Sequence, residues 1–113
     1  SHHDLGGLLM EMGDLVGARY HVERGVELGV RALGEDHPNV AIGLNGLGSL
    51  LSDQGDLLGA RRQFERALRI LEIAPGDTRA AYATTLGNLA GVLRDLGDLQ
   101  MARRHFERAG RRL

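Results

Sequence analysis

The 113-residue sequence contains no cysteine and no tryptophan, and it has only two residues each of phenylalanine, tyrosine and proline. The lack of cysteine excludes a disulfide framework, a thiolate zinc site and a cysteine nucleophile. No apolar run approaches the roughly 18 residues needed to span a bilayer, and no signal peptide is visible. We therefore expect a cytoplasmic protein that does not cross a membrane.

Lysine is also missing, so all fourteen basic residues are arginines, and fifteen acidic residues leave a net charge of −1. This balance argues against a dominant attraction to nucleic acid or to anionic membranes. The absence of lysine also excludes an amine that could form a Schiff base. With so few aromatic residues, the core has to come mostly from leucine, valine and alanine.

Three copies of one pattern recur at an interval of 42 residues, and each contains a Gly-Asp-Leu tripeptide, at 13–15, 55–57 and 97–99. An Ala-Arg pair begins three residues after each tripeptide, and a Glu-Arg pair begins five residues after that alanine. Upstream, leucines stand at equivalent positions, namely Leu5, Leu47 and Leu89, followed by Leu9, Leu51 and Leu93. So many coincidences at one offset indicate an internal repeat.

Each unit has the pattern of two helices joined by a turn. Leucines upstream of Gly55 and apolar residues around Phe64 recur at the three- and four-residue spacing of amphipathic helices. Gly55 can adopt the left-handed backbone conformation that ends the first helix. Asp56 can act as the N-cap of the second helix, where its carboxylate accepts hydrogen bonds from free backbone N–H groups. The same chemistry predicts turns at Gly13-Asp14 and Gly97-Asp98, so we expect three helical hairpins that stack to bury their apolar faces.

The second copy stands at the spacing of the tetratricopeptide repeat signature, with Leu47-Gly48, Leu51, Gly55, Ala60, Phe64 and Ala67. The third copy follows the same signature with Leu89-Ala90, Leu93, Gly97, Ala102, Phe106 and Ala109. The first copy departs from it, because Val22 and Gly25 replace the usual Phe and Ala. The chain thus resembles the tetratricopeptide repeat proteins, and its long period and the joining segment 33–38 resemble the kinesin light chain type.

The resemblance implies an all-α fold, a right-handed superhelical solenoid of three helix–turn–helix repeats. The repeats cover about residues 1–36, 37–76 and 77–113. Solenoids need solvated end caps, and none is visible here. We therefore expect the sequence to be a fragment of a longer protein, or its ends to pack against another copy. Ser1-His2-His3 is either native sequence or the remnant of a tag.

The resemblance also implies a concave wall lined by the first helix of each repeat. The repeat register then predicts the residues that face a bound partner. In the first repeat they are His3, Met10 and Glu11. In the second repeat they are Ile42, Asn45, Ser49, Ser52 and Asp53. In the third repeat they are Thr84, Asn88, Gly91, Arg94 and Asp95.

Two features of this wall point to a peptide ligand. Asn45 and Asn88 carry both donors and acceptors, which suits them to hold the backbone of an extended peptide. Glu11, Asp53 and Asp95 form a row of one carboxylate per repeat, which would attract a segment with basic residues. The alternatives are a wet helix face that tolerates asparagine, and a solvated acidic face. Acids near a helix C-terminus are unfavourable for the helix dipole, however, so their recurrence favours binding.

Other chemistries find little support. His21 and His105 occupy equivalent positions in different repeats, so we expect them to lie too far apart to share a metal ion. The sequence also contains no motif typical of a catalytic site or of a cofactor-binding site. Arginines on the second helices alternate with glutamates, as in Arg61 and Glu65, which disfavours nucleic-acid binding. We expect a non-catalytic scaffold without metal or cofactor that binds a protein or peptide. The alternative is a structural spacer or self-association element that uses apolar end faces around Leu5, Leu9, Leu68 and Leu113.

Overall fold

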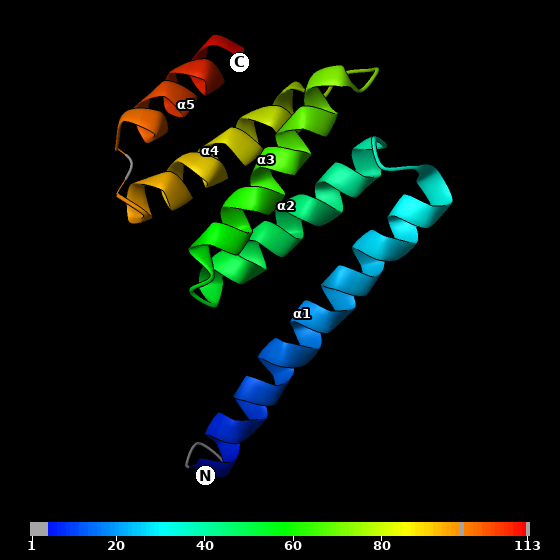
Figure 1. The fold of residues 1–113 in the computed structure, drawn as a ribbon, viewed down its shortest axis with the longest axis vertical. Helices are drawn as coiled ribbons and strands as arrows, with labels where there is room; N and C mark the ends of the chain where they lie inside the picture. The colour runs from blue at the N-terminus through cyan, green and yellow to red at the C-terminus, as the bar shows by residue number, and fades with distance from the viewer. Residues whose placement is uncertain (1–4, 98, 113) are drawn as a thin grey trace.

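The computed structural model describes residues 5–97 and 99–112, and these residues form five α-helices. The helices are α1 (Leu5–Leu33), α2 (Pro38–Asp53), α3 (Leu57–Ile73), α4 (Arg79–Asp95) and α5 (Leu99–Arg112). Each helix packs against the next one in the chain, and α2 also contacts α4 (Figure 1). The predicted all-α solenoid is confirmed.

The turn between α2 and α3 forms as the sequence predicts. Gly55 has a φ of +87°, a left-handed conformation that glycine adopts without a steric penalty. The side chain of Asp56 then accepts a hydrogen bond of 2.9 Å from the backbone N–H of Gly59 and so caps α3. Gly97, which ends α4, has a φ of +89°. Two of the three predicted hairpins, α2–α3 and α4–α5, are therefore present.

The joints between the repeats also use the predicted residues. At the first joint, Nδ1 of His37 accepts a hydrogen bond of 3.0 Å from the backbone N–H of Asn39, and Pro38 is the first residue of α2. At the second joint, the backbone N–H of Arg79 donates to the Asp77 carboxylate at 3.2 Å. Both joints therefore satisfy a backbone N–H group at the start of the next helix.

The turn predicted at Gly13-Asp14 is wrong, because α1 runs without a break over 29 residues. A closed hairpin needs packing between its two helices to offset the loss of helical hydrogen bonds at the turn. In the second repeat that packing centres on Phe64, which is 1 % exposed. The first repeat has the smaller Val22 at the equivalent position and Gly25 in place of an alanine. With less apolar surface to bury, the continuous helix is favoured.

The core lies between α2, α3 and α4. Its largest fully buried side chains are Tyr82, Phe64, Leu44, Leu86 and Leu89. The hydroxyl of Tyr82 donates to Glu72 at 2.8 Å, and Arg108 of α5 contacts both Glu72, at 3.0 Å, and the same hydroxyl. This network joins the end of α3 to α4 and α5.

The third repeat differs from the second at the signature aromatic residue. Phe64 is buried, whereas its equivalent Phe106 is 50 % exposed. A Cβ atom built on Gly48 would lie 2.6 Å from Cε1 of Phe64, so the ring occupies space that only glycine leaves open. The residue equivalent to Gly48 in the third repeat is Ala90, whose Cβ would conflict with a ring placed as that of Phe64 is. This difference is consistent with the exposure of Phe106.

Candidate functional site

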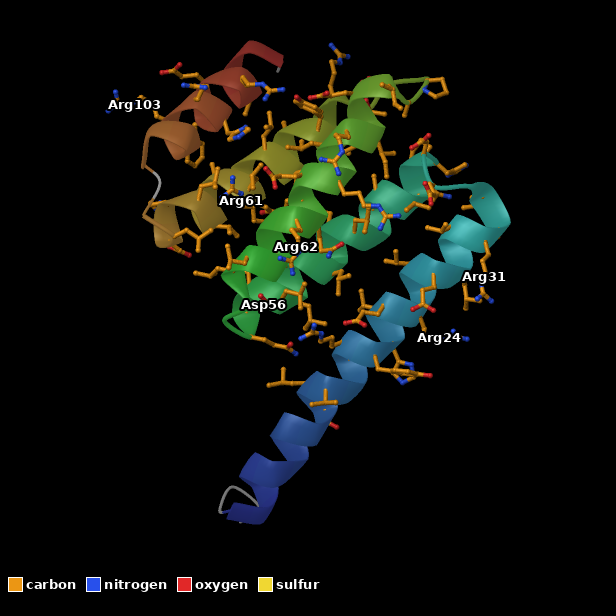
Figure 2. The ribbon with its side chains drawn as sticks, viewed as in Figure 1. Arg24, Arg31, Asp56, Arg61, Arg62 and Arg103 are labelled. Carbon is orange, nitrogen blue, oxygen red and sulfur yellow. The ribbon has the colours of Figure 1, made fainter. Side chains whose placement is uncertain are left out.

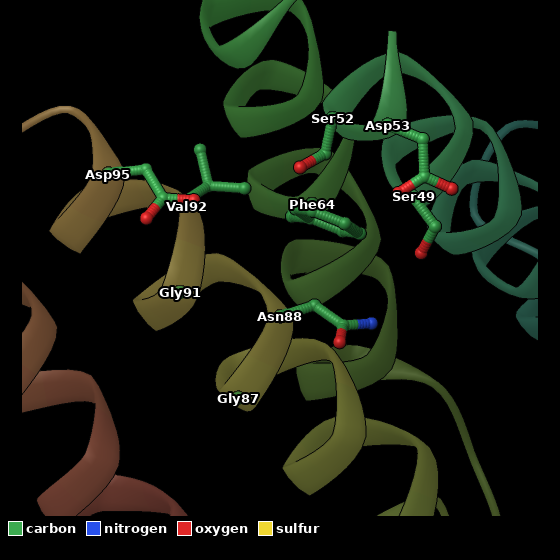
Figure 3. A pocket seen from close by; sticks show the side chains of 9 residues that line it. All are labelled: Ser49, Ser52, Asp53, Phe64, Gly87, Asn88, Gly91, Val92 and Asp95. Carbon is green, nitrogen blue, oxygen red and sulfur yellow. The ribbon is translucent and has the colours of Figure 1, made fainter. Parts of the chain in front are cut away.

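The side of the solenoid on which α2 faces α4 carries two adjoining pockets. The first has a volume of about 260 Å³. Its lining residues come from α2, α3 and α4, and they are Ser49, Ser52, Asp53, Phe64, Gly87, Asn88, Gly91, Val92 and Asp95 (Figure 3). The second pocket, of about 220 Å³, includes Ile42, Asn45 and Thr84. We call the two pockets together the α2–α4 groove.

Most of the predicted partner-binding residues line this groove. The structure brings together Ile42, Asn45, Ser49, Ser52, Asp53, Thr84, Asn88, Gly91 and Asp95. Arg94 does not belong to the set, because it is exposed and lines neither pocket. His3 lies outside the described residues, as do the side chains of Met10 and Glu11.

The two predicted asparagines contact each other across the groove. Nδ2 of Asn88 donates a hydrogen bond of 3.1 Å to Oδ1 of Asn45, so a bridge of two amides joins α2 to α4 between the pockets. The sequence predicted that each amide would hold a peptide backbone. The bridge uses one of the several hydrogen-bonding positions of each amide and fixes the orientation of both side chains.

Asp53 and Asp95 supply negative charge at one end of the groove. They occupy equivalent positions in successive repeats and line the same pocket (Figure 3). No arginine or histidine is among the described residues that line this pocket. Among those residues, the charges that border it are the two carboxylates. Whether Glu11 extends the row stays a prediction.

Glycines keep one wall of the groove free of side chains. Gly87 and Gly91 line the first pocket, one helical turn apart on α4. A Cβ atom at either position would meet no heavy atom within 4 Å, so packing does not require glycine there. Each glycine costs about 0.8–1 kcal/mol of helix stability relative to alanine. The open wall that results lets the backbone of a ligand come close to α4.

Sequence reasoning missed the apolar floor of the groove. Phe64 and Val92 line the first pocket, although both are almost fully buried. Ala41, Leu71 and Thr85 line the second pocket in the same way. The pattern assigns such residues to the core, and a core residue can also touch a pocket from below. Only the packing of α2 against α4 shows which of them do so.

The arginines with described side chains do not form one basic surface. The labelled ones are spread over α1, α3 and α5 (Figure 2). Several pair with a glutamate of the same helix, such as Arg19 with Glu23 at 2.7 Å and Arg61 with Glu65 at 3.6 Å. Exposed pairs of this kind contribute a few tenths of a kcal/mol each. The distribution favours a solvated outer face over a nucleic-acid interface.

His105 of α5 is buried, with 9 % of its surface exposed, and its Nδ1 atom has no hydrogen-bond partner among the described residues. Burial lowers the pKa of His105 below its ordinary value of 6.5, and the charges of Arg108, Arg104 and Arg61 lower it further, against Glu65. Across the part of the chain that the structure describes, no group of three His, Asp or Glu side chains is placed to hold a metal ion.

The pKa of His105 predicts a pH dependence of stability. The unfolded chain binds this proton at a higher pH than the folded chain, so the free energy of unfolding should fall as the pH drops through about 6.5. We expect His105→Leu to remove this part of the pH dependence and to remove a buried unpaired nitrogen. Thermal unfolding of both proteins at neutral and mildly acidic pH measures the effect. Parallel pH profiles for the two proteins would contradict the prediction.

Comparison with known proteins identifies the family. The tetratricopeptide repeat family model matches residues 1–73 and, in an overlapping match, residues 41–111. The chain therefore belongs to the tetratricopeptide repeat family. Such repeats generally mediate interactions between proteins and are generally non-catalytic scaffolds.

Among solved structures, the chain is similar to BtubC (BKLC) from P. vanneervenii, with a TM-score of 0.84 and 29 % sequence identity. BtubC is a kinesin-light-chain-like tetratricopeptide repeat protein, which confirms the predicted subtype. The match covers 96 % of this chain and 44 % of BtubC, so the chain spans less than half the length of that protein. No curated protein matches the chain. No helix among the described residues is long and apolar enough to cross a membrane.

Proposed function

We propose that the α2–α4 groove binds an extended peptide segment that carries arginine or lysine side chains, and that the chain is a protein-interaction scaffold. The observation that carries this proposal is the position of Asp53 and Asp95. Two successive repeats place a carboxylate in one pocket, and no basic residue stands among the described residues that line it. A cationic side chain of a ligand would satisfy both.

The rest of the groove suits the backbone of such a segment. The Asn45–Asn88 bridge presents amide groups to it, and Ser49 and Ser52 add hydroxyl groups from α2. The glycines of α4 leave room for the peptide to lie close to the helix. Charge would determine which segments bind, and amide hydrogen bonds would hold the backbone of any of them.

The test is the double charge reversal Asp53→Arg with Asp95→Arg. Both side chains lie at the rim of an open groove, so each lost charge pair should weaken binding by about tenfold and the pair by about a hundredfold. The probes are two extended peptides that differ only in having arginine or glutamate at alternate positions. Fluorescence anisotropy of the labelled peptides measures the affinity of each.

The matched control is Glu35→Arg with Asp36→Arg, which changes the net charge equally at an exposed joint outside the groove. We expect this control to bind the arginine peptide like the native chain. Circular dichroism shows whether both variants keep their helices. If the Asp53/Asp95 variant binds the arginine peptide as well as the control does, the carboxylates are a solvated face and the proposal fails.

Of the four end-face residues predicted for the alternative role in self-association, only Leu68 has a described side chain. Leu68 is 5 % exposed and belongs to the core. Leu113 and the side chains of Leu5 and Leu9 lie outside the described residues.

A further inference from the structure

Helices α1 and α3 both pack against α2, and a second groove lies between them (Figure 1). Two pockets of about 300 Å³ and about 310 Å³ form it, and they share Val26, Glu27 and Arg66. We call the two pockets together the α1–α3 groove. Its floor includes Val26 of α1 and Leu47 and Leu51 of α2, and all three are buried. The α1–α3 groove shares no lining residue with the α2–α4 groove, so it is a separate surface.

The carboxylates that line the α1–α3 groove already have partners. Glu23 pairs with Arg19 at 2.7 Å, and Glu27 pairs with Arg24 at 3.1 Å, in both cases within α1. The Asp56 carboxylate accepts the hydrogen bond that caps α3. These contacts are made within single helices or at a helix end, so they leave the groove open.

Three arginines of the groove differ from these residues. They are Arg31 of α1 and Arg62 of α3, both labelled in Figure 2, and Arg66 of α3. In the described part of the chain, no carboxylate lies within ion-pair distance of any of the three. Once the pairs within α1 are set aside, three positive charges face the single negative charge of Asp56. The groove is therefore locally basic.

The next joint of the solenoid shows what such an arginine binds. Arg108 stands at the position of Arg66, one repeat of 42 residues later, and it pairs with the carboxylate of Glu72 at 3.0 Å. The residue equivalent to Glu72 at the first joint is Val30, which lines the α1–α3 groove together with Arg66. Arg66 therefore keeps the repeat position but lacks the carboxylate that its equivalent binds.

We propose that the α1–α3 groove binds a segment of another protein that carries aspartate or glutamate side chains. One carboxylate of the segment lies beside Val30, in the place that Glu72 occupies at the next joint, and pairs with Arg66. Arg62 and Arg31, on the two walls, pair with further carboxylates. The apolar floor keeps water from one side of these contacts, which strengthens the attraction between the charges.

Supplying the missing carboxylate from the chain itself tests the proposal. Val30→Glu places a glutamate as many residues before Arg66 as Glu72 stands before Arg108. The internal pair would compete with the ligand, so we expect the peptide with glutamate at alternate positions to bind about tenfold more weakly. Val30→Gln is the matched control, because it has the same size without the charge, and it should bind like the native chain. Fluorescence anisotropy of the labelled peptide measures each affinity.

Arg62→Glu is a second variant, at an exposed side chain whose replacement leaves the core untouched. We expect it to weaken binding of the glutamate peptide by at least about tenfold. Arg69→Glu is its control, since Arg69 is equally exposed on α3 but lines neither pocket, and it should leave the affinity unchanged. Circular dichroism shows whether all four variants keep their helices. Each should bind the arginine peptide like the native chain, which separates this test from that of the α2–α4 groove.

Three results would overturn the proposal. The first is that the native chain does not bind the glutamate peptide. The second is that the glutamate peptide binds Val30→Glu as tightly as Val30→Gln, or Arg62→Glu as tightly as Arg69→Glu. The third is a native dimer in sedimentation velocity that Arg62→Glu converts to a monomer, because a second copy of the chain would then fill the groove.

Discussion

Replacing Phe64 with alanine is expected to destabilise the chain by about 3–5 kcal/mol. The ring is 1 % exposed, and it fills the space above Gly48 where α2 meets α3, so its removal leaves a cavity that the two helices cannot close without moving. Small domains have a total stability of about 5–15 kcal/mol, so this one change removes a large part of it. Urea unfolding followed by far-UV circular dichroism measures the loss.

The third repeat offers a control at the same signature position. Phe106→Ala removes a ring that is 50 % exposed, and we expect it to cost less than about 1 kcal/mol. Equal losses for the two variants would mean that Phe106 packs like Phe64, and that Ala90 does not keep the ring out of the core. The comparison therefore tests the explanation for the difference between the two repeats as well as the size of the effect.

Replacing Leu86 with alanine is expected to cost about 2–5 kcal/mol. Leu86 of α4 is 0 % exposed in the core that α4 shares with α3, and Leu44, its equivalent in α2, is buried to the same degree. Because the two leucines hold one repeat position, we expect Leu44→Ala to cost a similar amount. Chemical unfolding of each variant gives the two values.

Thr84→Ala is the control for Leu86→Ala, two residues away on the same helix. Thr84 is exposed, so its replacement should change the free energy of unfolding by no more than about 0.5 kcal/mol. If Leu86→Ala were as mild as this control, α4 would not be packed against the rest of the solenoid as the structure describes.

The sequence predicted the local features of the fold and missed features that depend on packing. The turn at Gly55-Asp56 was predictable because glycine and aspartate act within a few residues of their own position. The same dipeptide at Gly13-Asp14 stays helical, because closing a hairpin depends on what the two helices bury against each other. Turn residues permit a turn, and contacts distant in sequence determine whether it forms.

The candidate site shows the same division. The repeat register was sufficient to bring Asp53 and Asp95 to one pocket, since equivalent residues of stacked repeats line one wall. It could not show that Asn88 donates a hydrogen bond to Asn45, because that contact depends on the distance between α2 and α4. Nor could it show that Arg94 stays outside the groove, since neighbouring residues on a helix point in different directions.

The residues at the three equivalent signature positions, Val22, Phe64 and Phe106, predict that parts of the solenoid differ in their resistance to deformation. Only the central repeat has its signature ring inserted between its own two helices, so the α2–α3 pair should resist deformation while α1 and α5 yield first. Tyr82 of α4 is 1 % exposed, so α4 stays with α2 and α3. Both walls of the α2–α4 groove therefore belong to the stiff part, and tension along the chain would detach α1 or α5 before it widened the groove and released a bound peptide.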